Sequence, residues 1–241
     1  MTVTYYNTKN FYLFRKPHNI PTTFGENKSF LDFLVNHKSS KIKKIFNKQK
    51  KSFTKDQEYG LCNRLDNPTS GLIYFAKNQT TYNNYKIKQN KNKITKTYIA
   101  TIKWHFWPNR PIFSYDKNFL TQSINRLIDN GQQTSKKCIV NFPIKHHRHL
   151  SDRMVWVYNQ KQLSKTRWKK HYRMTYIQRI YYDPKDHKTT LKIKITKGIR
   201  HQIRVHLSSI WYPIIGDWIY NSNYKKNSNT PLNLWSIWVK I

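Results

Sequence analysis

The fold of this chain is most constrained by a series of short apolar or alternating runs, each as long as a β-strand, in irregular order with a few helical segments. In the run LKIKI, leucine and isoleucine alternate with lysine, so residues 190–196 are predicted to form a strand with one buried and one basic face. Similar runs predict further strands at residues 12–15, 72–76, 97–104, 174–182 and 234–241.

Helical periodicity is confined to three segments. Residues 29–46 keep the apolar spacing of one helix, Ser29 can cap its first turn, and Asp32 lies where the helix dipole favours an acid. Residues 80–93 are polar and predicted to be helical, and residues 200–210 carry an apolar stripe at positions i, i+4 and i+7. Because strands outnumber helices and do not alternate with them, the sequence predicts an α+β fold rather than a doubly wound parallel sheet.

The formal net charge is +34, from 45 Lys and Arg against 11 Asp and Glu. A compact chain this basic repels itself, so nucleic acid is the first partner to consider and an anionic membrane surface the second. Drift toward lysine in an A+T-rich genome is the alternative. Such drift should also admit glutamate, yet only Glu26 and Glu58 are present. We therefore expect a polyanionic partner.

Several sequence motifs are absent, and their absence argues against particular classes of protein. Cys62 and Cys138 form no CxxC pair, which favours a reducing compartment and argues against structural zinc. The chain shows neither an apolar leader nor 18 consecutive apolar residues, so we expect a soluble cytoplasmic protein, with an organellar location left open. P-loop, dinucleotide-binding and HExxH motifs are absent. The cluster HHRH at residues 146–149 contains an arginine, and we interpret it as a basic RNA-facing loop rather than a metal site.

Two segments carry candidate chemistry. The first, NRLDNPTSGL at residues 63–72, places Asp66 before an Asn-Pro pair, which is also ordinary turn chemistry. Taken alone, it is explained equally well by a turn and by a functional site. The second, KGIRHQIRVHLSSIWYPIIGDWIY at residues 197–220, shifts the balance toward a site when the two are taken together.

The two segments resemble the signatures of the RluA-type RNA pseudouridine synthases. Residues 63–77 resemble that family's HRLDxxTSGL motif, and residues 197–217 resemble its TGRTHQIRVHL and PIxGD motifs. Weaker blocks follow in the family's order at residues 14–21 (FRKPHNIP), 96–100 (KTYIA), 142–157 (FPIKHHRHLSDRMVWV), 165–177 (KTRWKKHYRMTYI) and 232–241 (LNLWSIWVKI). The similarity spans residues 11–241 apart from residues 106–137, which we expect to be an insertion.

The resemblance implies a mixed, largely antiparallel sheet with flanking helices around a basic cleft. We accordingly expect residues 1–241 to form a single catalytic domain without an N-terminal S4 RNA-binding domain. It also implies that neither a cofactor nor a metal is required.

The resemblance also assigns catalytic residues. Asp66 matches the family's catalytic aspartate, and the sequence leaves open whether it acts as a nucleophile or as a base. Arg204 matches the arginine that keeps this aspartate ionised, since an opposite charge within ~4–6 Å lowers a carboxylate pKa by roughly one to three units. A phosphate contact is the alternative for Arg204. Tyr98, within KTYIA, matches the tyrosine that stacks on the target base and is the candidate for removing the C5 proton.

Further matched residues are expected to bind RNA or line the active site. Arg64 would fill the space that a flipped uridine leaves, or alternatively contact a phosphate. Arg200 and His201 are expected to contact RNA, and Leu207 and Ile215 to form an apolar wall.

The chain departs from the family pattern in two places. Asn63 replaces the usual histidine before Arg-Leu-Asp. At residues 198–201 the sequence is GIRH in place of GRTH, so the arginine is displaced by one position, or by ~100° if a helix has begun there.

The sequence therefore predicts a cofactor-independent RNA pseudouridine synthase, an isomerase acting on specific uridines of rRNA or tRNA as a monomer. The alternatives are a catalytically silent RNA-binding protein of the same fold and a basic ribosome-associated structural protein. Intact Asp66, Tyr98 and Arg204 argue against both, because RNA binding alone requires no carboxylate at the site.

Overall fold

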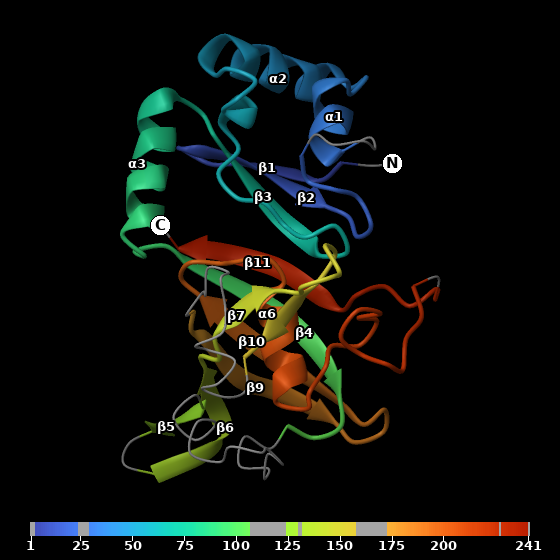
Figure 1. Ribbon diagram of the computed structural model, residues 1–241. Coiled ribbons are helices and arrows are strands. Elements are labelled where there is room, and N and C mark those ends of the chain that lie inside the picture. Colours follow the sequence, from blue (N-terminus) through green and yellow to red (C-terminus); the bar gives the residue numbers. More distant parts are fainter. Residues whose placement is uncertain are drawn as a thin grey trace. The chain divides into compact units, whose positions relative to one another are not determined.

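The computed structural model describes residues 3–23, 29–106, 124–129, 132–157, 173–226 and 228–240, with side chains described outside residues 124–136. The chain divides into two compact units, which are described one at a time (Figure 1). The N-terminal unit consists of Met1–Ile94 with Trp235–Ile241, and the central unit consists of Thr95–Leu234. The expectation of one catalytic domain over residues 1–241 stays a prediction.

The N-terminal unit combines a small sheet with three helices and a 3₁₀ turn. Its elements are β1 (Tyr5–Asn7), β2 (Phe11–Lys16), α1 (Phe30–Val35), α2 (Ser40–Ser52), η1 (Glu58–Gly60), β3 (Ser70–Ala76), α3 (Gln79–Asn90) and β11 (Leu234–Lys240). The strands lie in the order β1-β2-β3-β11, with β1, β2 and β3 antiparallel and β11 parallel to β3. The strands predicted at residues 12–15, 72–76 and 234–241 and the helix predicted at 80–93 are confirmed.

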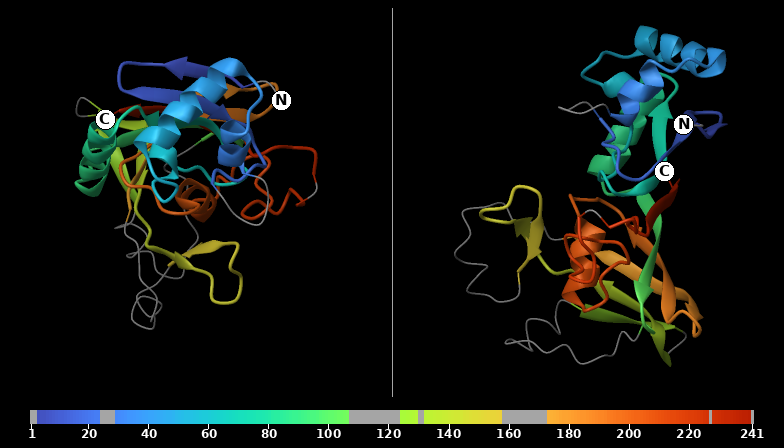
Figure 2. Two further views of the ribbon diagram at one scale, coloured as in Figure 1. Left: turned by 90° about the horizontal axis from the view of Figure 1, so that it is seen from above. Right: turned by 90° about the vertical axis from the view of Figure 1, so that its right-hand side faces the viewer.

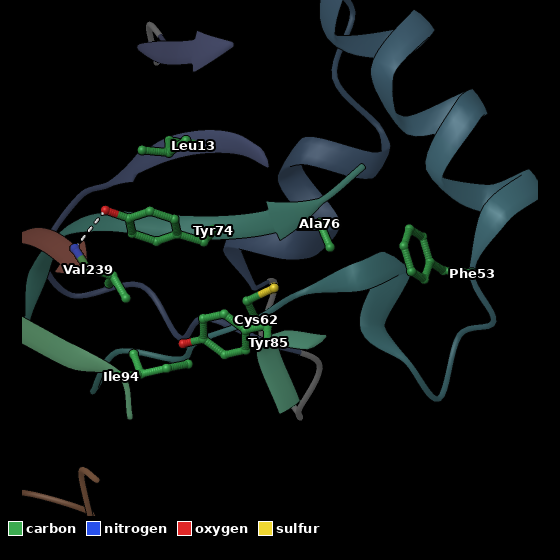
Figure 3. Close-up of a cluster of buried hydrophobic side chains, with 8 residues drawn as sticks. All are labelled: Leu13, Phe53, Cys62, Tyr74, Ala76, Tyr85, Ile94 and Val239. Carbon is green, nitrogen blue, oxygen red and sulfur yellow. Dashed lines mark hydrogen bonds between the residues drawn. The ribbon is translucent and has the colours of Figure 1, made fainter. Parts of the chain in front are cut away.

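A cluster of buried side chains fixes β3 within this unit (Figure 3). Its members are Leu13, Phe53, Cys62, Tyr74, Ala76, Tyr85, Ile94 and Val239. The phenol oxygen of Tyr74 accepts the backbone N–H of Val239 at 3.0 Å, so a polar atom inside the cluster is satisfied. Burial raises the pKa of this phenol. The cluster joins β3 to β2, α3 and β11, and it thereby anchors the strand that follows Asp66.

The helix expected at residues 29–46 is in fact two helices. Its predicted start is confirmed by a capping box, in which Ser29 Oγ accepts the Asp32 N–H at 3.1 Å and Asp32 Oδ2 accepts the Ser29 N–H at 3.0 Å. However, α1 ends before Asn36, whose backbone N–H donates to the Asp32 carbonyl, and α2 begins at Ser40. The prediction of one helix is wrong because the apolar spacing continues across the short polar break.

The central unit is built on an antiparallel sheet. Its elements are β4 (Thr95–Lys103), β5 (Ile124–Asp129), β6 (Gln132–Val140), β7 (Ile144–His146), β8 (Met154–Trp156), β9 (Thr175–Asp183), β10 (Lys188–Ile195) and α6 (Gln202–Ser209). The strand order is β4-β10-β9-β6-β5, and every neighbouring pair is antiparallel. Leu191 and Ile193 of β10 are fully buried whereas Lys194 is exposed, which confirms the predicted alternation. Within the described residues, both units therefore confirm the α+β class.

The sequence did not predict β1 or the four strands from β5 to β8. β7 and β8 form a separate two-stranded hairpin beside α6 (Figure 2). Strands of three residues are too short to show a period of two. Within the expected insertion at residues 106–137, residues 107–123 and 130–131 lie outside the described residues. Its described part contains β5 and most of β6, and β6 pairs with β9. That this segment is an insertion stays a prediction.

Candidate functional site

Asp66 lies in a tight turn of the N-terminal unit. Its backbone carbonyl accepts the N–H of Thr69 at 3.0 Å, which closes a turn around Asn67 and Pro68 directly before β3. Asp66 itself is partly buried. The segment therefore does form the turn that its sequence allows, and this turn carries the candidate residue Asp66.

Gly71 of the same motif serves packing. Its φ is +120°, and a Cβ atom at this position would lie 2.2 Å from the carbonyl oxygen of Ser236 in β11. Only glycine accommodates both the backbone conformation and the close approach. This glycine lets β11 lie against β3, so it belongs to the scaffold of the Asp66 turn rather than to its chemistry.

A buried lysine supports the Asp66 turn. Lys16 is fully buried, and its ammonium donates to the carbonyl oxygens of Pro17 at 2.8 Å, Ile20 at 2.8 Å and Asn67 at 3.0 Å. Burial lowers the pKa of Lys16 to about 7, and the negative charge of Asp66 opposes this shift. The three carbonyl acceptors match the three N–H donors of the ammonium form of Lys16, which lies beside the turn that carries the candidate aspartate.

Two more side chains fix the segment that enters the turn. Asn63 is buried; its Oδ1 accepts the Tyr74 N–H at 2.8 Å and its Nδ2 donates to the Leu72 carbonyl at 3.3 Å. Thr22 Oγ1 accepts the N–H of Leu65 at 3.1 Å and donates to its carbonyl at 2.7 Å. Asn63, which departs from the family pattern, thus forms a structural link to β3.

The mostly exposed side chain of Arg64 forms an ion pair with Glu58. Its Nη2 lies 2.5 Å from Glu58 Oε1 and its Nε lies 3.2 Å from Glu58 Oε2. The side chain of Arg64 is 66% exposed and that of Glu58 is 16% exposed. Because two nitrogen atoms face two oxygen atoms, the contact fixes the plane of the guanidinium. The expected role of Arg64 in base flipping stays a prediction.

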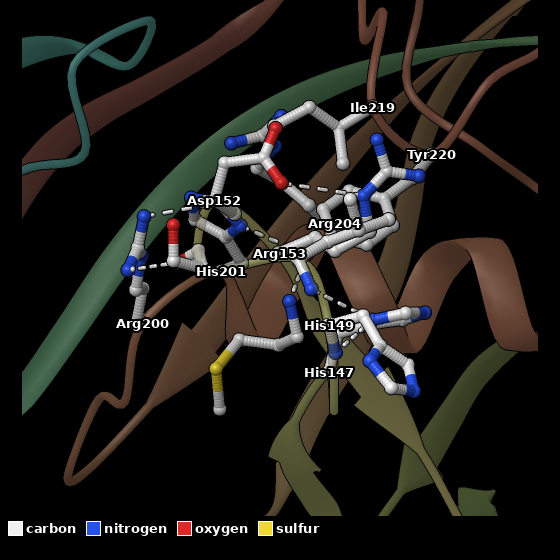
Figure 4. A network of polar contacts seen from close by, with 12 residues as sticks. His147, His149, Asp152, Arg153, Arg200, His201, Arg204, Ile219 and Tyr220 are labelled. Atoms are coloured by element: carbon white, nitrogen blue, oxygen red, sulfur yellow. Dashed lines mark hydrogen bonds and ion pairs between the residues drawn. The ribbon is translucent and has the colours of Figure 1, made fainter.

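Arg204 of the central unit is held by a buried acid. Its Nε and Nη2 donate to the two carboxylate oxygens of Asp217 at 2.8 Å and 2.7 Å, and both side chains are almost fully buried. Asp217 also accepts the backbone N–H groups of Ile219 and Tyr220. The Tyr220 ring lies 5.1 Å from the Arg204 guanidinium (Figure 4). This arrangement fixes the direction of Arg204. The expected pairing of Arg204 with Asp66 stays a prediction.

His201 precedes α6 in a left-handed conformation, with φ of 55°. Its Nδ1 lies 2.8 Å from the Tyr220 hydroxyl, which accepts the backbone N–H of Met154 at 2.8 Å. Burial, reinforced by the charges of Arg204 and Arg200, lowers the pKa of His201 to about 3. The imidazole is therefore neutral at neutral pH, and it links α6 to the β7–β8 hairpin.

Arg200 lies before the helix. Because α6 begins at Gln202, the rotation of ~100° considered for a helical position does not apply to it. The Arg200 guanidinium donates to the carbonyl oxygens of Ser151 at 2.9 Å and Asp152 at 3.4 Å, in the loop of the β7–β8 hairpin (Figure 4). The displaced arginine thus holds this loop, and its predicted RNA contact, like that of His201, stays a prediction.

The remaining predicted residues are buried in the central unit. Tyr98 lies on β4 opposite Ile193 of β10 and is 7% exposed. Leu207 is fully buried on α6, and the backbone N–H of Ile215 donates to the Thr101 carbonyl at 3.0 Å. Their expected roles, in base contact for Tyr98 and in an apolar wall for Leu207 and Ile215, stay predictions.

His206 is a fully buried titratable group on α6. Its Nε2 lies 2.9 Å from the Phe142 carbonyl, and its Nδ1 lies 2.7 Å from Thr175 Oγ1. A carbonyl only accepts, so Nε2 carries the proton and the neutral Nδ1 accepts from the threonine hydroxyl. Burial lowers the pKa of His206 to about 4. It is a neutral structural residue.

Within the described ranges, no three His, Cys, Asp or Glu side chains are grouped as metal ligands would be. In the HHRH loop, His147 Nδ1 accepts the backbone N–H groups of His149 and Leu150, both at 3.1 Å, so this nitrogen stabilises the loop. No helix in the described parts of the chain is long and apolar enough to cross a membrane.

Sequence reasoning missed three charged residues that contact or support predicted site residues, two in the N-terminal unit and one in the central unit. Lys16 lies in the FRKPHNIP block and Asp217 ends the PIxGD block, so both were quoted without a role. Glu58 lies outside every motif. The sequence contains two glutamates, and this scarcity was the signal that could have drawn attention to Glu58.

Comparison with known proteins extends these observations. The sequence model of a family described as RNA pseudouridylate synthase matches residues 10–209. The chain is 28% identical over 176 residues to ribosomal large subunit pseudouridine synthase D of Buchnera aphidicola subsp. Acyrthosiphon pisum, covering 71% of this chain and 44% of that protein. It is 30% identical over 223 residues to the protein of the same name from Borreliella burgdorferi, covering 89% and 53%. The chain thus spans about half the length of these curated relatives.

The fold also matches a solved structure. The structure titled Human RNA Pseudouridylate Synthase Domain Containing 1 has a TM-score of 0.64 and 15% identity, with 100% of this chain and 78% of that chain covered. At this identity, the likeness supports the fold alone.

Proposed function

Because the chain belongs to the RNA pseudouridylate synthase family, we propose that it is an RNA pseudouridine synthase. The reaction breaks the C1′–N1 bond of a uridine, turns the base and joins C1′ to C5. The C5 proton is lost and N1 gains one, so the change is an isomerisation that consumes no second substrate. The observation that carries the proposal is Asp66, which a supported turn presents inside the matched region.

Asp66 is proposed to act on the ribose or the base in its ionised form. In its ammonium form, Lys16 supports ionised Asp66 from the end of β2, since the ammonium and the carboxylate attract each other. Arg204, whose Nε and Nη2 are held by Asp217, is the proposed second counter-charge of Asp66. Tyr98 is the proposed base contact and the candidate acceptor of the C5 proton.

Binding is proposed to depend on the basic side chains. A stacked uridine is out of reach of the carboxylate, so the base has to leave the stack at a cost of a few kcal/mol. Arg64 is proposed to occupy the vacated place, and Arg200, His201 and the HHRH loop to contact RNA. The net charge of +34 supplies the long-range attraction.

The proposed substrate is a structured RNA, either rRNA or tRNA, modified by a monomer in the cytoplasm or an organelle. The names of the two curated relatives, which refer to the large ribosomal subunit, favour testing rRNA first.

The test compares the purified protein with its Asp66→Ala variant on rRNA and tRNA transcripts, with chemical mapping of pseudouridine. We expect site-specific conversion by the unaltered protein and none by the variant. RNA affinity should stay nearly unchanged, because it comes mainly from Lys and Arg contacts to phosphates. Asp56→Asn, which removes an exposed acid outside the motif, is the matched control and should retain activity.

Two outcomes would contradict the proposal. Residual turnover by Asp66→Ala would overturn the role of Asp66. Tight, salt-sensitive RNA binding without conversion of any uridine in either RNA class would favour the catalytically silent RNA-binding protein.

A further inference from the structure

Glu58 is one of the few acids of this strongly basic chain, and it contacts an arginine. It is one of two glutamates in the sequence, and it contacts Arg64, two residues before Asp66, through both carboxylate oxygens. Nothing in the motif resemblance gives Glu58 a role.

The position of Glu58 is set without Arg64. Glu58 and Tyr59 both have left-handed backbones, with φ of 49° and 54°, and such conformations persist in non-glycine residues only where the surroundings enforce them. Here the buried Gln49 of α2 enforces them. Its Nε2 donates to the Tyr59 carbonyl at 2.9 Å and to the Ala76 carbonyl at 2.8 Å. The backbone that carries Glu58 is therefore held by α2, and its carboxylate meets the mostly exposed side chain of Arg64.

Folding stability does not account for this contact. The Glu58 side chain is 16% exposed but the Arg64 side chain is 66% exposed, so water and salt compete for the guanidinium and the pair contributes little to stability. What the contact does provide is orientation and charge compensation. A compensated guanidinium is less attracted to phosphate but keeps its flat face for stacking.

We propose that Glu58 is a positioning residue for Arg64: it holds the guanidinium as an oriented, charge-compensated plane that stacks in place of the flipped uridine, and keeps it from binding a phosphate. This inference rests on the proposed function, in which Arg64 fills the vacated stack. Glu58 itself touches neither the base nor the ribose in this arrangement.

The first experiment measures RNA affinity against salt and needs no turnover. The probe is one RNA hairpin with uridines in its loop. In Glu58→Gln, the released Arg64 should gain a phosphate contact, so the slope of log Kd against log salt should steepen by about 0.7 to 0.9. Asp56→Asn removes one negative charge two positions away but leaves the Arg64 contact in place, and its slope should match that of the unaltered protein.

The second experiment measures the single-turnover rate constant on a converted RNA. Glu58→Gln should lower this constant by about 10-fold or more, because a misplaced group loses the productive geometry, while Kd stays equal or falls. Glu58→Asp, which keeps the charge, should recover part of the loss. In an Arg64→Gln background, Glu58→Gln should change neither the rate constant nor the salt slope.

The outcomes separate this inference from the proposed function. If the unaltered protein converts no uridine, the proposed function fails, while the salt slope still decides whether Glu58 restrains Arg64. If the unaltered protein is active but Glu58→Gln behaves as Asp56→Asn does, or acts equally without Arg64, the inference is overturned.

Discussion

Two arginines of this chain make the same two-point contact with a carboxylate in opposite surroundings. Arg64 and Glu58 lie at the surface, with side chains 66% and 16% exposed, whereas Arg204 and Asp217 are 1% and 0% exposed. Around the exposed Arg64 guanidinium, water and salt can take the place of the carboxylate at little cost. In the interior, removal of one partner leaves an uncompensated charge. The exposed pair suits a side chain that changes partners, and the buried pair suits one that keeps a fixed direction.

The largest effect should come from breaking the buried pair. Asp217→Asn leaves the Arg204 charge without its carboxylate, so the free energy of unfolding should fall by about 3–5 kcal/mol. Urea unfolding followed by circular dichroism measures this change. Asp56→Asn, which changes an exposed acid, is the control and should change stability by less than about 0.5 kcal/mol. Equal effects of the two variants would remove the distinction between buried and exposed pairs.

The buried region should also be the acid-sensitive one. Burial lowers the pKa of His206 from 6.5 to about 4, so the unfolded chain takes up this proton first as pH falls. The stability linked to neutral His206 is fully present above pH ~6.5 and is lost as pH falls toward about 4, at up to roughly 1.4 kcal/mol per pH unit.

Unfolding measured between about pH 6.5 and about 5 tests this, because most carboxylates stay ionised there. His206→Gln should make the decline shallower, and His201, whose pKa burial lowers to about 3, should account for part of the decline that remains. A decline as steep in His206→Gln as in the unaltered chain would contradict the assignment.

Replacing each arginine by lysine tests the same comparison, with an expected stability loss of intermediate size at the buried pair. Lysine keeps the charge but lacks the planar fork, so Arg204→Lys should leave part of Asp217 unsatisfied and lower stability by about 1–3 kcal/mol. Arg64→Lys should leave the thermal midpoint within experimental error. A larger loss for Arg64→Lys would reverse the comparison.

A small stability effect is also expected for Glu58→Gln. An exposed pair contributes roughly 0–1 kcal/mol, so the unfolding midpoint should barely move. A stability loss near that of Asp217→Asn would mean that Glu58 serves folding rather than Arg64. The proposed positioning role would then lose its basis.

Much of the fold follows from local pattern. The alternation in β10 and the continuous apolar run of β3 predicted strands, and the Ser29 capping box began a helix where expected. Local pattern did not predict very short strands or the break between two consecutive helices. The three-residue strands β7 and β8 are too brief to show a period. The apolar residues before and after the polar segment 36–41 keep one helical spacing, so they do not reveal the break between α1 and α2.

At the candidate site, too, some features follow from neighbours in the sequence and others do not. The turn at Asp66 follows from Asn67 and Pro68, which are adjacent in sequence. Its support from Lys16 does not, because the two residues lie 50 positions apart and only the packing of β2 beside β3 brings them together.

The sequence by itself determined the basic charge, the α+β class, the turn that carries Asp66 and the motif resemblance, because all of these depend on composition or on neighbours along the chain. Only the tertiary structure decided how the charges are paired and buried. The same guanidinium chemistry is restrained at the surface by Glu58 and locked in the interior by Asp217. Burial and partner choice depend on which distant segments exclude water together, and no local pattern records that.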